Sequence, residues 1–174
     1  MAITDQKANL SVQAMAELSE EQLANLQRLN QLRYRAGTQS DRLCYCAELE
    51  ALIEREFGAA SRLAVYGSLA PGQANHHVLS EIPGQWQAGL FVRGHLVQQG
   101  WGVELGFPAL RWVAHGSPVD IWLFVSANLP QHWARLDEFE GADYQRILVP
   151  VFDKQKLIRI ANLYALPPGD SAQE

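Results

Sequence analysis

The stretch Leu63-Ala64-Val65-Tyr66-Gly67-Ser68-Leu69 decides the fold of this chain of 174 residues. Its first four residues are apolar and predict a short strand. Gly67 ends the strand, because glycine allows the backbone to turn with a positive φ angle. Backbone N–H groups after such a turn can face one concavity and hold an anion or a polarised oxygen, and Ser68 adds a hydroxyl donor. An ordinary structural turn can have the same residues, so this loop alone does not distinguish a binding site from a turn.

A second turn follows this loop. Gly72 and Asn75 predict a turn into a short helix that carries Val78 and Leu79. The sequence of the two turns matches neither the Gly-x4-Gly-Lys-Ser/Thr phosphate loop nor the Gly-x-Ser-x-Gly nucleophile elbow. Nucleotide binding and a serine nucleophile are therefore not indicated here.

Residues 61–168 form a domain in which predicted strands outnumber helices. Runs of β-branched, aromatic and other apolar residues predict strands at 86–97, 110–114, 119–125, 147–152 and 157–165. Residues 153–156 are typical of a hairpin turn between the last two runs. This order is not a regular strand–helix–strand series, so it predicts an α+β fold with a closed or half-closed sheet. The tail at 169–174 is expected to be flexible.

A helix is predicted over residues 129–140, ending before a glycine. Leu129, Trp133, Leu136 and Glu140 follow one another at steps of four, three and four, so they share one helix face. A carboxylate at the end of an apolar stripe is costly to bury, and desolvation would raise its pKa and make it a better base. The alternative, which the stripe alone slightly favours, is that Glu140 swings out to solvent at a fraying helix end.

Residues 1–60 are rich in good helix formers and predict a helical hairpin in front of the main domain. Ser19 and Gln22 have the spacing of a capping box. Ser40 or Asp41 is expected to cap the second helix, and Gly58 to end it. The first helix has an apolar side formed by Leu23, Leu26, Leu29 and Leu32. We expect a structural arm packed on the main domain or on a second copy, which allows a homo-oligomer through these helices.

Composition and charge exclude several classes of protein. The chain has 14 Lys and Arg against 19 Asp and Glu, a net charge of −5, which gives no basic footprint for nucleic acid or an anionic membrane surface. No apolar run is long enough to span a bilayer, and the polar start does not resemble a signal peptide. Cys44 and Cys46 lack further ligands at metal-binding spacing, so they are interpreted as reduced thiols of a cytoplasmic protein without a metal site.

Two separated motifs occur in one order along the chain. The first is Val65-Tyr66-Gly67-Ser68-Leu69, followed by the segment Gly72-Gln73-Ala74-Asn75-His76. The second is Leu136-Asp137-Glu138-Phe139-Glu140-Gly141, followed by Tyr144-Gln145-Arg146. Together they resemble the γ-glutamylcyclotransferase-like (AIG2-like) family, and the segment from Gly72 is especially similar to the γ-glutamylamine cyclotransferase branch. The likeness runs from Leu63 to about Leu166, so the hairpin lies outside it.

The resemblance implies a small mixed β-barrel-like sheet with flanking helices. It also implies that Tyr66, Gly67, Ser68 and Leu69 hold the γ-glutamyl part of a substrate and that Glu140 is the acid/base. The implied reaction converts a γ-glutamyl amine or γ-glutamyl amino acid to 5-oxoproline and a free amine, without a cofactor or metal. The likeness favours an amine as leaving group, such as lysine linked through its side chain. The alternative is a binding module of the same fold that holds a small carboxylate without turnover.

Several residues near the second motif have two open roles. Tyr144 lines the pocket with its hydroxyl near Glu140, or it packs on the sheet as a strand residue. Asp137 is expected to be solvated, and Arg146 either pairs with a neighbouring carboxylate or lies on the surface. Most of the five tryptophans are expected in the core, with one or two walling a pocket. Residues 89–111 match no motif of the family, and we expect them to encode substrate choice.

Overall fold

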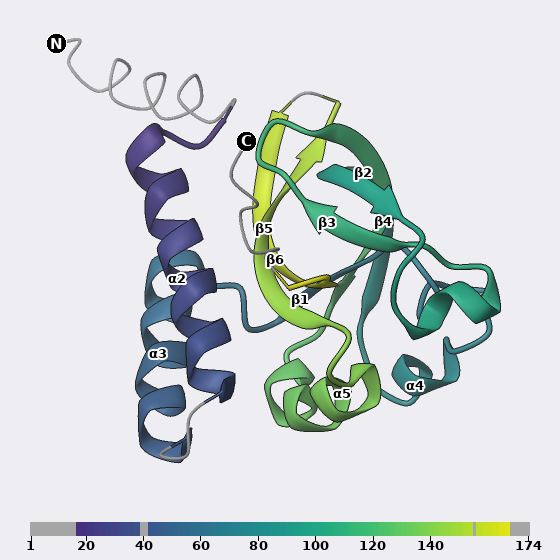
Figure 1. The fold of residues 1–174 in the computed structure, drawn as a ribbon, viewed down its shortest axis with the longest axis horizontal. Coiled ribbons are helices and arrows are strands. Elements are labelled where there is room, and N and C mark those ends of the chain that lie inside the picture. Colours follow the sequence, from purple (N-terminus) through teal and green to yellow (C-terminus); the bar gives the residue numbers. More distant parts are fainter. Residues whose placement is uncertain (1–16, 39–41, 155, 168–174) are drawn as a thin grey trace, which may run out of the picture.

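A computed structural model of the chain describes residues 17–38, 42–154 and 156–167 (Figure 1). The strands of its sheet are β1 (Arg62–Val65), β2 (Gln85–Val97), β3 (Ala109–Trp112), β4 (Ser117–Val125), β5 (Gln145–Asp153) and β6 (Lys156–Ala165). They follow the order β3-β2-β4-β1-β6-β5, and a further pairing of β2 with β5 closes the sheet into a barrel. β1 runs parallel to β6, whereas β1 and β4 are antiparallel. The predicted α+β fold with a mixed barrel-like sheet is therefore confirmed.

Helices flank this barrel on two sides (Figure 1). They are α2 (Glu20–Thr38), α3 (Arg42–Phe57), α4 (His77–Ser80) and α5 (Trp133–Glu140), with the 3-10 helices η1 (Trp101–Leu105) and η2 (Leu129–Gln131). In the view of Figure 1, α4 and α5 lie below the barrel, and α2 and α3 stand beside β5. The short helix predicted around Val78 and Leu79 corresponds to α4, in which both side chains are buried.

The prediction of one helix over residues 129–140 is wrong, because the structure divides it into η2 and α5. Pro130 occupies the first turn of η2, where its missing N–H is tolerated. His132, at the junction, has φ −111°, well away from the helical value. The apolar face survives the break, since Leu129 and Leu136 are fully buried and Trp133 is only 8% exposed.

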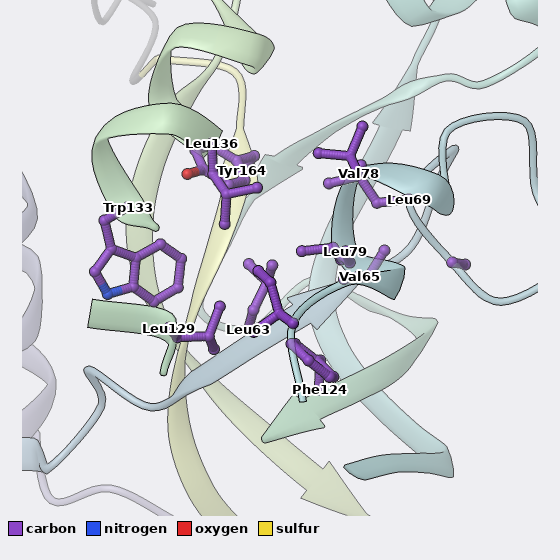
Figure 2. Close-up of a cluster of buried hydrophobic side chains, with 12 residues drawn as sticks. Leu63, Val65, Leu69, Val78, Leu79, Phe124, Leu129, Trp133, Leu136 and Tyr164 are labelled. Carbon is purple, nitrogen blue, oxygen red and sulfur yellow. The ribbon is translucent and has the colours of Figure 1, made fainter. Parts of the chain in front are cut away.

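This face of α5 packs in a core cluster with side chains from the barrel strands and from α4 (Figure 2). Leu63 and Val65 come from β1, Leu79 from α4, and Leu136 from α5. Each fully buried leucine contributes about 1.5–3 kcal/mol through removal of its side chain from water. Because the same cluster anchors β1 and α5, the loop after β1 and the end of α5 are held in fixed positions relative to each other.

The predicted helical hairpin is present as α2 and α3. Its capping box forms, since Gln22 N donates to Ser19 Oγ at 3.1 Å and Ser19 N donates to Gln22 Oε1 at 3.0 Å. Gly58 follows α3 with φ +58°, as its position after the helix predicts. The predicted cap at Ser40 or Asp41 lies outside the described residues.

The hairpin packs on the barrel of its own chain. Leu26 and Leu29 of α2 are fully buried, in one cluster with Leu148 of β5 and Ile160 of β6. Asn30 bonds the backbone of Leu148 in both directions, donating from Nδ2 at 2.9 Å and accepting at Oδ1 at 2.7 Å. This side chain therefore satisfies the backbone of β5 much as a neighbouring strand would.

Candidate active site

The loop after β1 and the end of α5 face each other across one cavity. The cavity is lined by Leu63, Ala64, Val65, Tyr66, Gly67, Ser68, Leu69, Trp101, Gly102, Phe107, Pro108, Glu140, Tyr144 and Tyr164. It thus brings together both sequence motifs, which are about 70 residues apart in the chain. All six residues singled out as catalytic or substrate-binding from the sequence lie on its wall.

The loop after β1 is held in place by Asn75 and His76, which belong to the turn that follows it. Asn75 donates from Nδ2 to Ser68 Oγ at 3.0 Å, and its backbone N–H donates to the carbonyl of Ser68 at 2.9 Å. His76 Nδ1 lies 3.1 Å from the carbonyl oxygen of Leu69, a hydrogen bond that requires the proton on Nδ1. In the part of the chain that the structure describes, the N–H groups of Gly67, Ser68 and Leu69 have no acceptor. These donors are therefore free to bind an oxygen of a ligand.

The predicted positive φ angle at Gly67 is wrong. Positive φ occurs at Gly72, in the second turn, but not at Gly67. The bend after β1 is instead closed by a hydrogen bond from the N–H of Ala70 to the carbonyl of Gly67, at 3.1 Å, in a turn that other residues can also adopt. A Cβ atom at Gly67 would meet the side chain of Phe107 at 3.9 Å, which is an ordinary contact.

Glu140 is buried at the end of α5, with only 8% of its surface exposed. The alternative in which it swings out to solvent is therefore wrong. Burial, and to a smaller extent the nearby charge of Asp137, together raise the pKa of its carboxyl to about 7. No side chain or backbone group of the described residues donates a hydrogen bond to this carboxylate. A carboxyl poised near neutral pH can both accept and return a proton.

Tyr66 anchors the loop through its hydroxyl. The hydroxyl donates to the carbonyl of Tyr164 at 2.9 Å and accepts from the N–H of Leu110 at 3.0 Å. Burial raises the pKa of this phenol above its usual range, so it stays neutral. Because both contacts are internal, the hydroxyl of Tyr66 joins β1, β3 and β6 at the floor of the cavity.

Tyr144 lies in the cavity wall beside a pair of glycines. A Cβ atom at Gly100 would come within 2.5 Å of the Tyr144 hydroxyl, and one at Gly102 within 3.2 Å. Burial raises the pKa of Tyr144, and the charge of Glu140 adds to this shift. The ring also meets Trp101 edge to face, with centroids 6.1 Å apart. Tyr144 therefore lines the pocket, which is the first of its two predicted alternatives.

Trp101 is a wall residue that the sequence did not single out. Its indole N–H donates to the main-chain carbonyl of Glu140 at 2.9 Å, and its ring meets Phe139 edge to face at 5.6 Å. Phe107 and Pro108 of the same connection complete the wall. The sequence signal was the triplet of residues 100–102, in which two glycines flank a tryptophan and indicate close backbone packing. The expectation that one or two tryptophans wall a pocket fits this position.

Asp137 is bound by two side chains although it was expected to be solvated. Its carboxylate is 44% exposed, yet it accepts from Arg146 Nε at 2.9 Å and from the hydroxyl of Tyr164 at 2.7 Å. Arg146 itself is only 10% exposed and stacks over Trp133 of α5, 4.6 Å from the ring centroid. Arg146 is therefore a buried ion-pair partner, the first of its two predicted alternatives.

The described residues contain no group of three or more His, Cys, Asp or Glu side chains placed to hold a metal ion. The side chains of Cys44 and Cys46 lie outside the described part of the chain. Among the helices that the structure describes, none has the length and apolar character needed to cross a membrane.

Residues 63–174 match the family model described as "Gamma-glutamyl cyclotransferase, AIG2-like". The chain belongs to this family. The matched region begins in β1 and includes the loop, Trp101 and Glu140, and it excludes the hairpin α2–α3 of this AIG2-like protein. The resemblance inferred from the two motifs is therefore confirmed.

Several solved structures are similar to this AIG2-like protein. YkqA from Bacillus subtilis is 23% identical, with a TM-score of 0.47, over 61% of this chain and 35% of that chain. An AIG2-like protein from Mus musculus is 23% identical, with a TM-score of 0.47, over 65% of this chain and 81% of that chain. The E. coli protein c4763 is 18% identical, with a TM-score of 0.45, over 60% of this chain and 78% of that chain. No curated protein matches the chain.

Proposed function

We propose that this protein is a cyclotransferase that converts a γ-glutamyl amine to 5-oxoproline and the free amine. The observation that carries the proposal is the position of Glu140, a buried carboxyl with a pKa raised to about 7, across one cavity from three unpaired backbone N–H groups. Membership of the AIG2-like family supports the reaction class. No cofactor is needed, because both reacting groups belong to the substrate.

The chemistry is an intramolecular aminolysis. The α-amine of the γ-glutamyl group attacks its own γ-carbonyl carbon, so a new N–C bond closes a five-membered ring. The bond from that carbon to the leaving nitrogen then breaks. Glu140 takes a proton from the attacking amine and returns one to the leaving nitrogen, so the enzyme ends in its starting state. Such acid–base assistance contributes about 10²–10⁴-fold to the rate, and holding the chain folded back on itself contributes more.

The loop after β1 supplies the donors for this step. The N–H groups of Gly67, Ser68 and Leu69 bind either the oxyanion that develops on the γ-carbonyl or the α-carboxylate of the substrate. The first role speeds the chemical step and the second fixes the orientation of the glutamyl group. Tyr144 closes the opposite wall near Glu140, and Tyr66 acts through the backbone that its hydroxyl anchors.

The leaving amine fits a groove that adjoins the cavity. This groove is lined by Asn75, Trp101, Leu105, Phe139, Glu140, Gly141, Ala142 and Asp143, and it shares Trp101 and Glu140 with the cavity. Apart from Glu140, the charged side chain on it is Asp143, and its other walls are largely apolar. A groove without a lining Lys or Arg favours an alkyl amine over an amino acid whose carboxylate needs a cationic partner.

Product analysis tests the proposal. The wild-type protein is incubated with γ-glutamyl alkylamines, γ-glutamyl dipeptides and lysine carrying γ-glutamyl on its side chain, and 5-oxoproline is measured by mass spectrometry. The matched α-glutamyl compounds serve as controls, because they cannot close the ring in the same way. We expect product from at least one γ-linked compound and from no α-linked one. A panel that gives no product, together with thermal stabilisation by one compound, would instead support the small-carboxylate binding module.

A further inference from the structure

The hairpin α2–α3 lies outside the matched family region, yet it is linked through Arg146 of β5 to the helix that carries Glu140. Arg33 of α2 binds Glu50 of α3 through two parallel bonds, Nε to Oε1 and Nη2 to Oε2, each 2.8 Å long. Its remaining nitrogen, Nη1, donates to the carbonyl of Arg146 at 3.2 Å and to Asn162 Oδ1 at 3.0 Å. The side chain of Arg33 is 9% exposed, so these contacts are made away from bulk water.

Arg146 is the next member of this network. Its side chain leaves β5 and contacts α5 twice, by a two-point ion pair with Asp137 and by stacking over Trp133. On the side of the hairpin, Arg146 Nη1 lies 3.7 Å from Glu50 Oε2. Arg146 is therefore shared between the hairpin and α5, and both of its carboxylate partners come from elements that pack on β5.

Asp137 links this network to the site. It lies one helical turn before Glu140, and the N–H of Gly141 donates to its main-chain carbonyl at 3.0 Å, closing the last turn of α5. The hydroxyl of Tyr164, a wall residue of the cavity, donates to the carboxylate of Asp137. Any movement of Asp137 would thus displace both the turn that presents Glu140 and one wall of the cavity.

We propose that Arg33 and Glu50 of the hairpin are positioning residues, which hold Arg146 on Asp137 and thereby fix the turn of α5 that presents Glu140. The inference rests on the proposed role of Glu140 for its kinetic part only. Without Arg33, the carboxylate of Glu50 loses its two hydrogen bonds but still lies near Arg146 Nη1. Glu50 then competes with Asp137 for the guanidinium of Arg146. A misplacement of the acid/base by about 1 Å can lower a rate by up to about 100-fold. The arm that was expected to be structural would then be part of the working site.

The test compares Arg33→Met with Arg28→Met. Arg28 lies on the same helix, and its bond is to Asn25 of the same helix, so the control removes an arginine without touching the network. Two properties are measured in the full-length protein: the amide hydrogen exchange of residues 137–141 and the values of kcat and KM. For Arg33→Met we expect about tenfold faster exchange there and about tenfold lower kcat, with KM changed less than about twofold. Arg28→Met should match the wild type in both.

Each other outcome is decisive as well. Exchange in residues 137–141 that is the same in both variants overturns the inference, and so does faster exchange with an unchanged kcat. If the wild type forms no 5-oxoproline, the proposed function fails, and the exchange measurement alone decides whether the hairpin holds α5. If Arg33→Met does not fold, Glu50→Gln replaces it, because this carboxylate is 38% exposed and its loss is better tolerated. The same direction of change, smaller in size, is expected.

Discussion

The indole N–H of Trp101 donates a 2.9 Å hydrogen bond to the main-chain carbonyl of Glu140. The last carbonyls of a helix have no partner within the helix, so this bond satisfies one of them from a distant segment. It ties η1, on the long connection between β2 and β3, to the residue that carries the proposed acid/base. This one contact therefore fixes the wall residue Trp101 relative to the end of α5, where Glu140 lies.

Replacement of Trp101 by phenylalanine tests this contact. Trp101→Phe keeps an aromatic ring near Phe139 and Tyr144 but removes the hydrogen bond, which stabilises the fold by about 1 kcal/mol. We expect a small loss of stability and a fall of about tenfold in kcat/KM, because the end of α5 loses its hydrogen bond to η1. Trp122→Phe is the control, because this tryptophan of β4 is 37% exposed and does not line the cavity. Equal kcat/KM values for the two variants would remove Trp101 from the site.

Substitution of Gly100 tests the position of Tyr144. Gly100 has φ +83°, and an added Cβ would come within 2.5 Å of the Tyr144 hydroxyl. Gly89→Ala is the matched control, because Gly89 has φ +78° but an added Cβ there meets nothing within 4 Å. Both variants carry the same backbone strain, and only Gly100→Ala displaces the phenol. We expect a higher KM in Gly100→Ala than in Gly89→Ala, and identical KM values would show that the Tyr144 hydroxyl does not contact substrate.

Glu140 should make the stability of the protein depend on pH. Its pKa is about 7 in the folded state against 4.5 for an ordinary glutamate, so the folded state binds more protons between these values. Stability from this group is therefore present at low pH and is lost as pH rises through about 7. Glu140→Gln has no titrating group here and lacks this loss. We therefore expect its free energy of unfolding to rise relative to that of the wild type by about 2–3 kcal/mol between pH 5 and pH 8. Urea unfolding of both proteins at the two pH values measures this difference. A difference that is the same at pH 5 and pH 8 would contradict the raised pKa of Glu140.

Asp137 should tune the pH dependence of the reaction. Its negative charge is one of the two causes that raise the pKa of Glu140. Asp137→Asn removes this charge, so the pKa of Glu140 should fall, and the rise of kcat with pH should move to lower pH. The shift should be modest, because the Asp137 carboxylate is 44% exposed and its field is screened by water. A shift toward higher pH would contradict the electrostatic role.

The local parts of the fold and site could be predicted from the sequence. The apolar run Leu63–Tyr66 marks the position of β1, which spans Arg62–Val65, because a short apolar run that ends at a turn favours a buried strand. The spacing of Leu129, Trp133, Leu136 and Glu140 predicted a shared face that is buried even though the helix breaks at His132, but by itself it slightly favoured an exposed Glu140. In both cases the pattern that predicts the element lies within a short stretch of the chain.

The features of the site that could not be predicted from the sequence depend on contacts between distant segments of the chain. Trp101 becomes a wall residue only because η1 folds onto the end of α5, and its bond joins residues 39 apart in sequence. Arg33 meets the carbonyl of Arg146 across 113 residues. The exposure expected for Asp137 is present, but its partners, Arg146 and Tyr164, come from two strands that no local pattern places beside α5. Such pairings depend on how the helices pack against the barrel.

The most direct test of the central claim is the rate of 5-oxoproline formation by Glu140→Gln, measured on the γ-glutamyl amine that the wild type turns over best. Glu138→Gln is the control, because Glu138 lies on the same helix with its side chain exposed. We predict that Glu140→Gln lowers kcat by at least about 100-fold, whereas Glu138→Gln stays within about twofold of the wild type. A Glu140→Gln variant that forms 5-oxoproline at the wild-type rate would contradict the account.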